Sequence, residues 1–439
     1  MTLNPLAEQL NQVIKTENPH LFDMLSDVGK ALFFPKGILS QGAEAKEKAH
    51  RINATIGIAK EQTHTMALQT VIDFIGDIPP RESLTYAPSY GIPALRKMWQ
   101  TMLFQKNPTL EGKAISLPVV TNGITHGVST LSDVWVNPGD TVMVPEMMWG
   151  NYNMIFHVKR GAKLISYPVF SADGGFNLLA FEKKLRATAG TTKKIIVILN
   201  FPHNPTGYTV SQDEGLALAD ILVSVAENGT NIIATCDDAY FGLFYEEATL
   251  KESLFALLCH RHPRLLAVKL DGATKENYVW GLRVGFLTYG GYFLNRAEPA
   301  YEALEKKTAG CIRGTISNAS HMSQSIVLKS MQDDRFINEK KEKYEILKRR
   351  AERVKVVISD PKYQDAFTAY PFNSGYFMCI RLKTVEAEPL RRHLLETYQV
   401  GLISLGKTDL RIAFSCLEVN EVSDLFDTIL KGIKELENH

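Results

Sequence analysis

A lysine and an arginine stand eight residues apart in the segment DGATKENYVWGLRVGF, and their residue types suit a shared chemistry. Lys275 follows an apolar run typical of a buried strand. A lysine that is partly shielded from water in such a place can act as an amine nucleophile and form a Schiff base. Arg283 carries a planar pair of donors that suits a phosphate. The segment therefore predicts covalent amine chemistry beside a bound phosphate.

Polar residues also gather where three successive predicted strands end. NFPHNPTG ends the run at 194–202, DDAY ends the run at 231–238, and DGATKEN ends the run at 264–272. Ligands bind at the carboxyl ends of the strands in open parallel sheets. These three segments therefore predict one site at one edge of a sheet.

Strands and helices must alternate to hold such a site. Short β-branched runs at 141–145, 194–202, 231–238 and 264–272 predict buried strands, and 211–229 has helical spacing of its apolar residues. This alternation predicts an α/β fold with a mainly parallel sheet covered on both faces. After about residue 320 the pattern changes. A charged helix at 333–360, strands at 374–382 and 409–417 and a terminal helix predict a second, smaller α/β unit.

The composition excludes several classes of protein. The 439 residues carry 49 basic and 48 acidic side chains, which is not the basic excess of a nucleic-acid-binding protein. No run of 18 apolar residues predicts a membrane span, and the first 20 residues do not resemble a signal peptide. The five cysteines are scattered, which predicts reduced thiols, no metal site and a cytoplasmic protein.

The segment GLISLGKT at 401–408 matches the phosphate-binding loop G-x-x-x-x-G-K-[ST]. That loop requires a strand before it and a helix after it. Here RRHLLETYQV before the segment is helical in pattern, and DLRIAFSCL after it is strand-like. The match is therefore interpreted as chance, and the segment as a short strand and a turn that aim the next strand.

The motifs together resemble the pyridoxal-phosphate (PLP)-dependent aminotransferases of fold type I, class I/II, and most the aspartate/aromatic branch, over about residues 52–417. The resemblance implies a three-layer, mainly parallel seven-stranded sheet in a large PLP-binding domain at 52–325. Residues 1–51 and 326–439 are then the N-terminal arm and the small domain. It also implies ping-pong transfer of an amino group between an amino acid and a 2-oxo acid such as 2-oxoglutarate, in a homodimer with shared active sites.

The resemblance implies a role for each matching cofactor residue. Lys275 is the lysine that holds PLP as a Schiff base and moves the proton. The aspartate that pairs with the pyridine nitrogen is Asp237, with Asp238 as the competing candidate, since only one of two neighbours in a strand faces the ring. The remaining cofactor residues it implies are Gly123, Ile124 and Thr125 at the phosphate, Trp149 at the ring face, Asn204 and Tyr240 at the ring hydroxyl, Thr274 and Arg283 at the phosphate, and Tyr86 crossing to the neighbouring subunit's phosphate.

The resemblance implies the substrate contacts as well. Arg411 matches the arginine that grips the α-carboxylate, and Gly57 lies in the stretch that covers the substrate. Arg313 matches the arginine that is donated across the dimer to a distal carboxylate, which favours aspartate or glutamate as one donor. Asn204 and Trp149 also contact the substrate. The choice among aspartate, glutamate and aromatic donors stays open.

One position departs from the family, because Gly272 stands where a phosphate-binding serine is common, three residues before the lysine. Two other functions are compatible with the fold. A lyase, decarboxylase or racemase would use the same cofactor, and a non-catalytic regulator would keep the fold without turnover.

Overall fold

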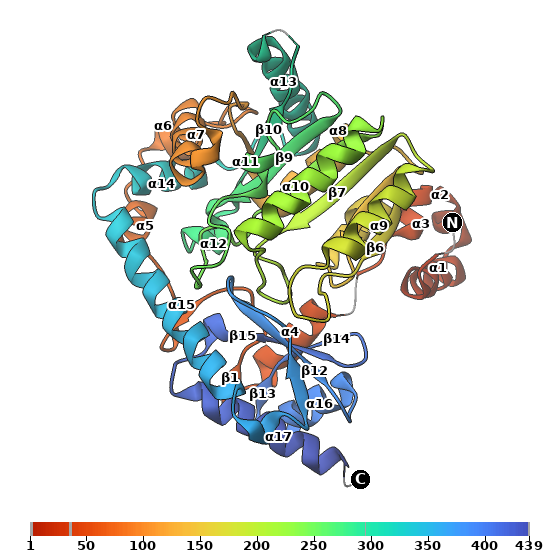
Figure 1. The fold of residues 1–439 in the computed structure, drawn as a ribbon, viewed down its shortest axis with the longest axis vertical. Coiled ribbons are helices and arrows are strands. Elements are labelled where there is room, and N and C mark those ends of the chain that lie inside the picture. Colours follow the sequence, from red (N-terminus) through yellow and green to blue (C-terminus); the bar gives the residue numbers. More distant parts are fainter. Residues whose placement is uncertain (1–2, 35–36, 295, 438–439) are drawn as a thin grey trace.

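The computed structural model describes residues 3–34, 37–294 and 296–437, and its centre is a seven-stranded sheet (Figure 1). The strand order is β4-β10-β9-β8-β7-β5-β6, and only β10 runs antiparallel to its neighbours. The mainly parallel sheet is therefore confirmed. The strands are β4 (Val119–Asn122), β5 (Thr141–Pro145), β6 (Lys163–Tyr167), β7 (Lys194–Asn200), β8 (Asn231–Asp237), β9 (Leu265–Gly272) and β10 (Val284–Gly291).

The central sheet is buried on both faces, which makes the fold three-layered. Ile195 and Val197 of β7 pack into one apolar core and Ile196 into another, because neighbouring side chains in a strand point to opposite faces. The first core includes residues of α7 (Pro93–Lys106), α9 (Leu178–Ala189), α10 (Gln212–Glu227) and α11 (Leu254–Leu258). The second includes residues of α8 (Gly123–Trp135), α13 (Ala297–Thr315) and a π-helical turn (Asn153–Val158).

The predicted elements of this sheet have the expected type, with small differences at their ends. The strand at 141–145 matches β5, and the predicted helix at 211–229 is α10, capped at its N-terminus by Ser211 with Glu214. The strand predicted at 194–202 ends at Asn200, because the chain turns into the polar segment that follows. Lys275 was expected in a turn, but it lies in the short helix α12 (Ala273–Glu276) that begins directly after β9.

A second, antiparallel sheet lies at the other end of the molecule (Figure 1). Its order is β11-β12-β15-β14, so that β14 is an edge strand. Its strands are β11 (Phe367–Ala369), β12 (Phe377–Leu382), β14 (Ile403–Leu405) and β15 (Asp409–Ala413), and its helices are α16 (Ala387–Tyr398) and α17 (Glu421–Glu437). The helix α15 (Phe336–Ile358) runs along one side of the molecule from the first sheet to the second.

The segment GLISLGKT contains the strand β14 and the tight turn that leads from it into β15. Gly406 has a φ of +57°, which favours glycine, and Thr408 is followed directly by β15. No helix follows the glycines, so the basis for phosphate binding is missing. The turn places β15 so that Arg411 pairs with Ile403 of β14.

The remaining elements connect these two sheets. The N-terminal helices are α1 (Pro5–Glu17), α2 (Pro19–Met24), α3 (Asp27–Ala31) and α4 (Ile38–Lys48). Two short pairs are β1 (Ile52–Asn53) with β13 (Val400–Gly401), and β2 (Lys60–Glu61) with β3 (His64–Thr65). The other helices are α5 (Gln69–Ile75), α6 (Pro80–Ser83) and α14 (His321–Gln332), with 3₁₀ turns at Pro108–Leu110, Trp280–Leu282, Pro361–Tyr363 and Phe414–Cys416.

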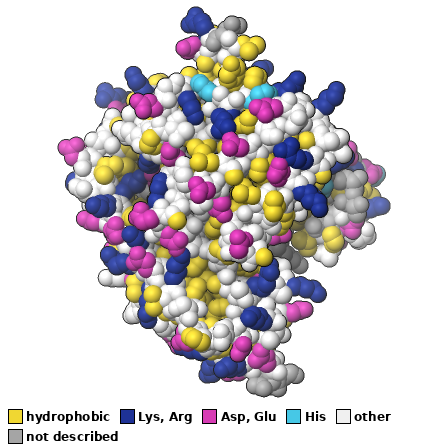
Figure 2. Space-filling view, in the orientation of Figure 1, with side chains coloured by type: hydrophobic (Ala, Val, Ile, Leu, Met, Phe, Trp, Pro, Cys, Tyr) yellow, Lys and Arg dark blue, Asp and Glu magenta, His cyan; other side chains and the backbone are white. Residues whose placement is uncertain are grey.

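The surface carries charges of both signs side by side. Figure 2 shows lysine, arginine, aspartate and glutamate side chains interspersed over the face in view. This mixture agrees with the near-balanced net charge of the sequence. Among the described helices, none is long and apolar enough to cross a membrane.

Candidate active site

A cavity of about 1060 Å³ opens between the carboxyl ends of the central strands and the second sheet. Its walls include the ends of β7, β8 and β9, the start of α8, and parts of α4, α16 and β14. Most of the predicted site residues line it, namely Gly57, Ile124, Thr125, Trp149, Asn204, Asp237, Tyr240, Thr274, Lys275, Arg283 and Arg411. The predicted convergence of three strand ends is therefore observed.

Lys275 is held at the floor of this cavity by α12. The backbone carbonyl of Lys275 accepts a hydrogen bond from the hydroxyl of Tyr376 at 3.0 Å. The Nζ lies 5.2 Å from the centre of the Tyr240 ring. Burial lowers the pKa of Lys275 to about 8, although the carboxylate of Asp237 opposes this change. At pH 7 about one-tenth of the lysine is therefore a neutral amine, which is the nucleophilic form and is far more than for a lysine with an ordinary pKa.

Asp237, at the end of β8, faces the same cavity and receives several hydrogen bonds. The hydroxyl of Tyr152 donates to Oδ2 at 2.5 Å, and the Nδ2 of Asn200 donates to the backbone oxygen at 2.8 Å. Burial raises the pKa of Asp237 to about 6, while the Tyr152 hydrogen bond and Lys275 lower it. The carboxylate of this buried residue is thus mostly ionised at neutral pH.

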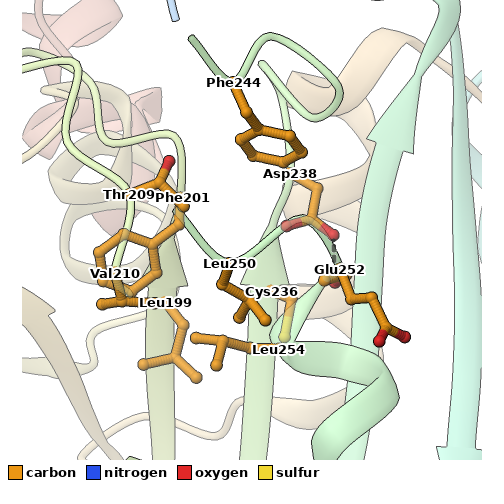
Figure 3. Close-up of a pocket in the computed structure, with 11 residues that line it drawn as sticks. Leu199, Phe201, Thr209, Val210, Cys236, Asp238, Phe244, Leu250, Glu252 and Leu254 are labelled. Carbon is orange, nitrogen blue, oxygen red and sulfur yellow. Dashed lines mark hydrogen bonds between the residues drawn. The ribbon is translucent and has the colours of Figure 1, made fainter. Parts of the chain in front are cut away.

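Asp237 lines the cavity, whereas Asp238 does not. The Asp238 side chain lies beside Cys236 and Phe244 (Figure 3) and lines a separate void of about 10 Å³. Its carboxylate accepts a hydrogen bond from Ser253 Oγ at 2.6 Å and pairs with the buried Lys269. The void is too small for more than one water molecule. Asp238 is therefore a structural partner of Lys269 and does not face the cavity.

One end of the cavity is built to hold an anion. Gly123 begins α8 with a φ of +76°, and a Cβ at this position would lie 2.4 Å from Arg283 Nη2. The glycine thus lets the guanidinium approach the first turn of the helix, where backbone N–H groups and the helix dipole favour a phosphate. Thr274 Oγ1 is buried and has no hydrogen-bond partner among the described residues. Ile124 and Thr125 complete this wall.

The departure at Gly272 has a steric cause. Gly272 pairs with Gly285 of β10, and a Cβ on Gly272 would lie 2.7 Å from the backbone oxygen of Val284. A serine does not fit there unless β10 moves. The unpartnered hydroxyl of Thr274, two residues later, is the donor that can take its place.

Aromatic and amide side chains form the middle of the cavity. The Trp149 ring meets Tyr152 edge to face with 5.5 Å between centroids. The buried Tyr240 ring packs edge-on against Phe377 at 5.5 Å. A Cβ on Gly57 would approach the Phe377 ring at 3.4 Å, so that a larger residue would narrow the cavity. The backbone N–H of Asn204 donates to Asn200 Oδ1, which fixes the turn after β7.

Arg411 is a buried guanidinium with spare hydrogen-bonding capacity. It is 3% exposed, and its Cζ lies 4.2 Å from the centre of the Phe377 ring. Nη2 donates to the backbone oxygen of Thr55 at 2.9 Å, and Nη1 reaches Asn204 Oδ1 at 3.4 Å. Its Nε has no partner among the described residues. Such a group suits a carboxylate.

Three predicted residues are not among those that line the cavity: Gly123, which begins α8 next to Arg283, and Tyr86 and Arg313. Tyr86 is 91% exposed, and Arg313 is exposed near the end of α13. Both were expected to act in a neighbouring subunit, and a single chain does not test that role.

Two features of the site were not predicted. Tyr152 follows Trp149 by three residues in the segment PEMMWGNYN, but nothing in its spacing identified Asp237 as its partner. Glu276 is the buried neighbour of Lys275, and it pairs with Lys106 of α7 and Lys340 of α15, the latter at 2.9 Å. Burial lowers the pKa of Lys340 to about 7. These contacts fix α12, and only the fold brings their three segments together.

The fold and the site together define the class of fold-type-I PLP transferases. Comparison with known families is more specific. The family model for aminotransferase class I and II matches residues 56–429, so the chain belongs to that family. Enzymes of this family are PLP-dependent.

Individual relatives agree with this assignment. An aspartate aminotransferase from Bacillus sp. (strain YM-2) is 28% identical over 60% of this chain, a match that spans 63% of its own length. A probable N-acetyl-LL-diaminopimelate aminotransferase from Bacillus subtilis is 24% identical over 80% of this chain and 81% of its own length. An aminotransferase structure from Anaerococcus prevotii has a TM-score of 0.83 at 22% identity and covers 93% of this chain and 98% of its own. That likeness concerns the fold.

Proposed function

We propose that the protein is a PLP-dependent amino acid aminotransferase that moves an amino group from an amino acid to a 2-oxo acid in two half-reactions. The observation that carries this proposal is the convergence of Lys275, Asp237 and Arg411 in one cavity. A nucleophilic amine, a buried carboxylate and a carboxylate-binding guanidinium are the groups that this reaction needs.

The described residues fit PLP. Arg283, Thr274 and the first turn of α8 would hold the phosphate, and Asp237 would pair with the ring nitrogen. Trp149 would cover the ring face, with Asn204 and Tyr240 at the ring hydroxyl. When bound, PLP supplies an electron-withdrawing ring that stabilises negative charge at the substrate Cα.

Lys275 is the group that moves protons. Its Nζ, with a pKa of about 8, exchanges between amine and ammonium near neutral pH. A base with such a pKa can take a proton from the substrate Cα and return it to a neighbouring atom. The ring of Tyr240 and the enclosing walls limit the access of water to this amine.

Arg411 orients the substrate. Its Nε and the long contact at Nη1 leave donors for the two oxygens of an α-carboxylate. An ion-paired carboxylate is stabilised in place, so that the Cα–H bond is the one presented to Lys275. This argument favours aminotransfer over the decarboxylase and lyase alternatives, and the intact set of reactive groups argues against a non-catalytic regulator.

The assembly and location belong to the same proposal. We propose a homodimer in which Tyr86 and Arg313 reach the partner's site, since both are exposed on one chain. In this proposal the large PLP-binding domain comprises residues 52–325, and the N-terminal arm and small domain comprise residues 1–51 and 326–439. Residues 1–2, 35–36, 295 and 438–439 lie outside the described part. The five free cysteines fit a reducing, cytoplasmic location.

The experiment that tests the function is a panel of amino donors with 2-oxoglutarate and the PLP-loaded protein. We expect aspartate, glutamate or an aromatic amino acid to be a donor, and Arg313→Ala to raise KM for the short dicarboxylates. Activity with small neutral donors only, unchanged in Arg313→Ala, would refute the role of Arg313. Absence of amino transfer from every donor would refute the function.

A further inference from the structure

The cavity continues well beyond the residues that serve the cofactor and the α-carboxylate. Its outer part is walled by α4, α16 and β14, and we call six of its residues the outer subsite: Gln41, Glu44, Glu388, Arg391, Arg392 and Ser404. The whole volume, about 1060 Å³, is at the upper end of the range for small-molecule sites, roughly 300–1,000 Å³. The cavity therefore has room for a substrate larger than aspartate.

Most of the charge in the outer subsite is already paired. Glu388 accepts from Arg391 Nε and Nη2, both at 2.7 Å, and from Ser404 Oγ at 2.6 Å. Arg391 is 2% exposed and also donates to Glu44 at 2.9 Å. Gln41 accepts from the backbone N–H of Ser404 and covers the edge of β14. Arg391 and Glu388 thus hold α4, α16 and β14 together.

Arg392 is different, because most of its guanidinium is free. Its Nε donates to Glu388 Oε1 at 2.8 Å, and its two Nη groups have no partner among the described residues. Its side chain is 65% exposed. Of the four arginines in the cavity wall, Arg283 and Arg411 belong to the inner end, and Arg391 is 2% exposed and bonds through Nε and Nη2 to two glutamates. Arg392 remains as the arginine that can offer a pair of donors to a second anion.

The strand register places the outer subsite and the α-carboxylate site on different faces of the β14–β15 ribbon. Arg411 pairs with Ile403, so these two side chains share one face of the β14–β15 ribbon. Ser404 points to the opposite face, where its hydroxyl meets Glu388 of α16. Leu405 and Gly406, which follow Ser404, line the same cavity as Arg411 and Arg392.

We propose that the outer subsite binds the distal carboxylate of a long-chain amino acid, with Arg392 as its donor. The proposal rests on the aminotransferase function and adds the substrate class. Arg411 and the outer subsite lie on different faces of the β14–β15 ribbon, so the proposal concerns acids longer than aspartate and glutamate. Two arginines and two glutamates balance the local charge, so Arg392 selects the acid through directed hydrogen bonds and not through an excess of positive charge.

The test compares 2-amino acids of increasing length that end in a carboxylate: glutamate, 2-aminoadipate, 2-aminopimelate and 2-aminosuberate. We expect kcat/KM of the PLP-loaded protein to rise with length. Arg392→Gln should lower it for the longest acids by about 10-fold to 100-fold, mainly through KM, because a charge-assisted hydrogen bond is lost. Glutamate should be unaffected by this substitution.

Two controls separate this role from a structural one. The neutral 2-aminooctanoate, which lacks the terminal carboxylate, should lose nothing in Arg392→Gln. Arg349→Gln removes an arginine that is exposed on α15 and outside the cavity wall. This substitution should leave kcat/KM unchanged for every amino acid tested. Equal losses for 2-aminooctanoate and 2-aminosuberate, or no loss for 2-aminosuberate, would overturn the proposal.

Calorimetric binding of the unreactive diacids adipate, pimelate and suberate to the PLP-loaded protein gives an answer that does not depend on turnover. We expect the dissociation constant of suberate to rise in Arg392→Gln. If the protein turns over no amino donor but Arg392→Gln still weakens suberate binding, the outer subsite stands and the proposed function fails. If turnover occurs and suberate binding is the same in both proteins, the subsite fails alone.

Discussion

The two ends of the cavity differ in how much of their hydrogen-bonding capacity is used. At the inner end Thr274 Oγ1 and Arg411 Nε have no partner among the described residues, and Asp237 is buried and ionised. At the outer end Glu388 is bonded by Arg391, Arg392 and Ser404, and the two Nη groups of Arg392 have no hydrogen-bond partner among the described residues. The unpartnered polar groups of the inner end therefore need a ligand as their hydrogen-bond partner. Most polar groups of the outer end instead bond to one another. Substitutions should change chemistry at the first and selectivity at the second.

The largest effect is expected for Lys275→Ala at the inner end. Loss of the amine removes both the covalent link to PLP and the proton carrier. Turnover should therefore fall by about 10²-fold to 10⁴-fold or more. The absorbance of PLP bound to a lysine should disappear. Lys184→Ala, on the exposed surface of α9, is the matched control and should behave like the wild type. Unchanged absorbance in Lys275→Ala would contradict the assignment.

Arg411→Gln should have the next largest effect. The α-carboxylate loses a buried charge-assisted contact, which costs about 2–5 kcal/mol and lowers kcat/KM by roughly 30-fold or more. PLP binding should persist, because Arg411 does not serve the phosphate. Steady-state kinetics together with the PLP absorbance separate these two results. A loss of PLP binding as large as that in Lys275→Ala would contradict the assignment of Arg411 to the α-carboxylate.

Glu276→Gln tests whether the ion pairs that Glu276 of α12 makes with Lys106 and Lys340 stabilise the fold. Lys106 and Lys340 would lose their buried carboxylate, and breaking such a pair costs about 3 kcal/mol in the free energy of unfolding. Urea denaturation measures this change. Glu182→Gln breaks an exposed pair with Arg186 on α9 and should change stability little. Equal stability of the two variants would show that the Glu276 cluster contributes nothing.

Tyr152→Phe should have the smallest effect, a change in pH dependence. Asp237 must be ionised to act, and the Tyr152 hydrogen bond favours its ionised form. Without that bond the pKa of Asp237, now about 6, rises, so the acid limb of kcat/KM moves to higher pH by about one unit. Tyr363→Phe removes a similar hydrogen bond to Asp427, far from the cavity, and should leave the profile unchanged. A shift toward lower pH would be the wrong sign.

The same contrast explains what the sequence could predict. The inner end is made of short segments that follow successive strands, so Lys275, Asp237 and Asn204 were found from local motifs. The outer end joins Gln41 and Glu44 of α4 to residues of α16 and β14, more than 300 positions later, and no local pattern links them. Tyr152 and Glu276 were missed for the same reason, because their partners come from distant elements. The sequence favoured Asp237 over Asp238, and of the two only Asp237 lines the cavity.

The central claim is best tested with PLP-loaded protein and an amino donor in the absence of any oxo acid. An aminotransferase should convert one donor molecule per site to its oxo acid and then stop, with a matching change in the PLP absorbance. Added 2-oxoglutarate should restore the absorbance and release glutamate. Continuous turnover of the donor alone, or release of CO₂, would contradict the account and would identify a lyase or decarboxylase.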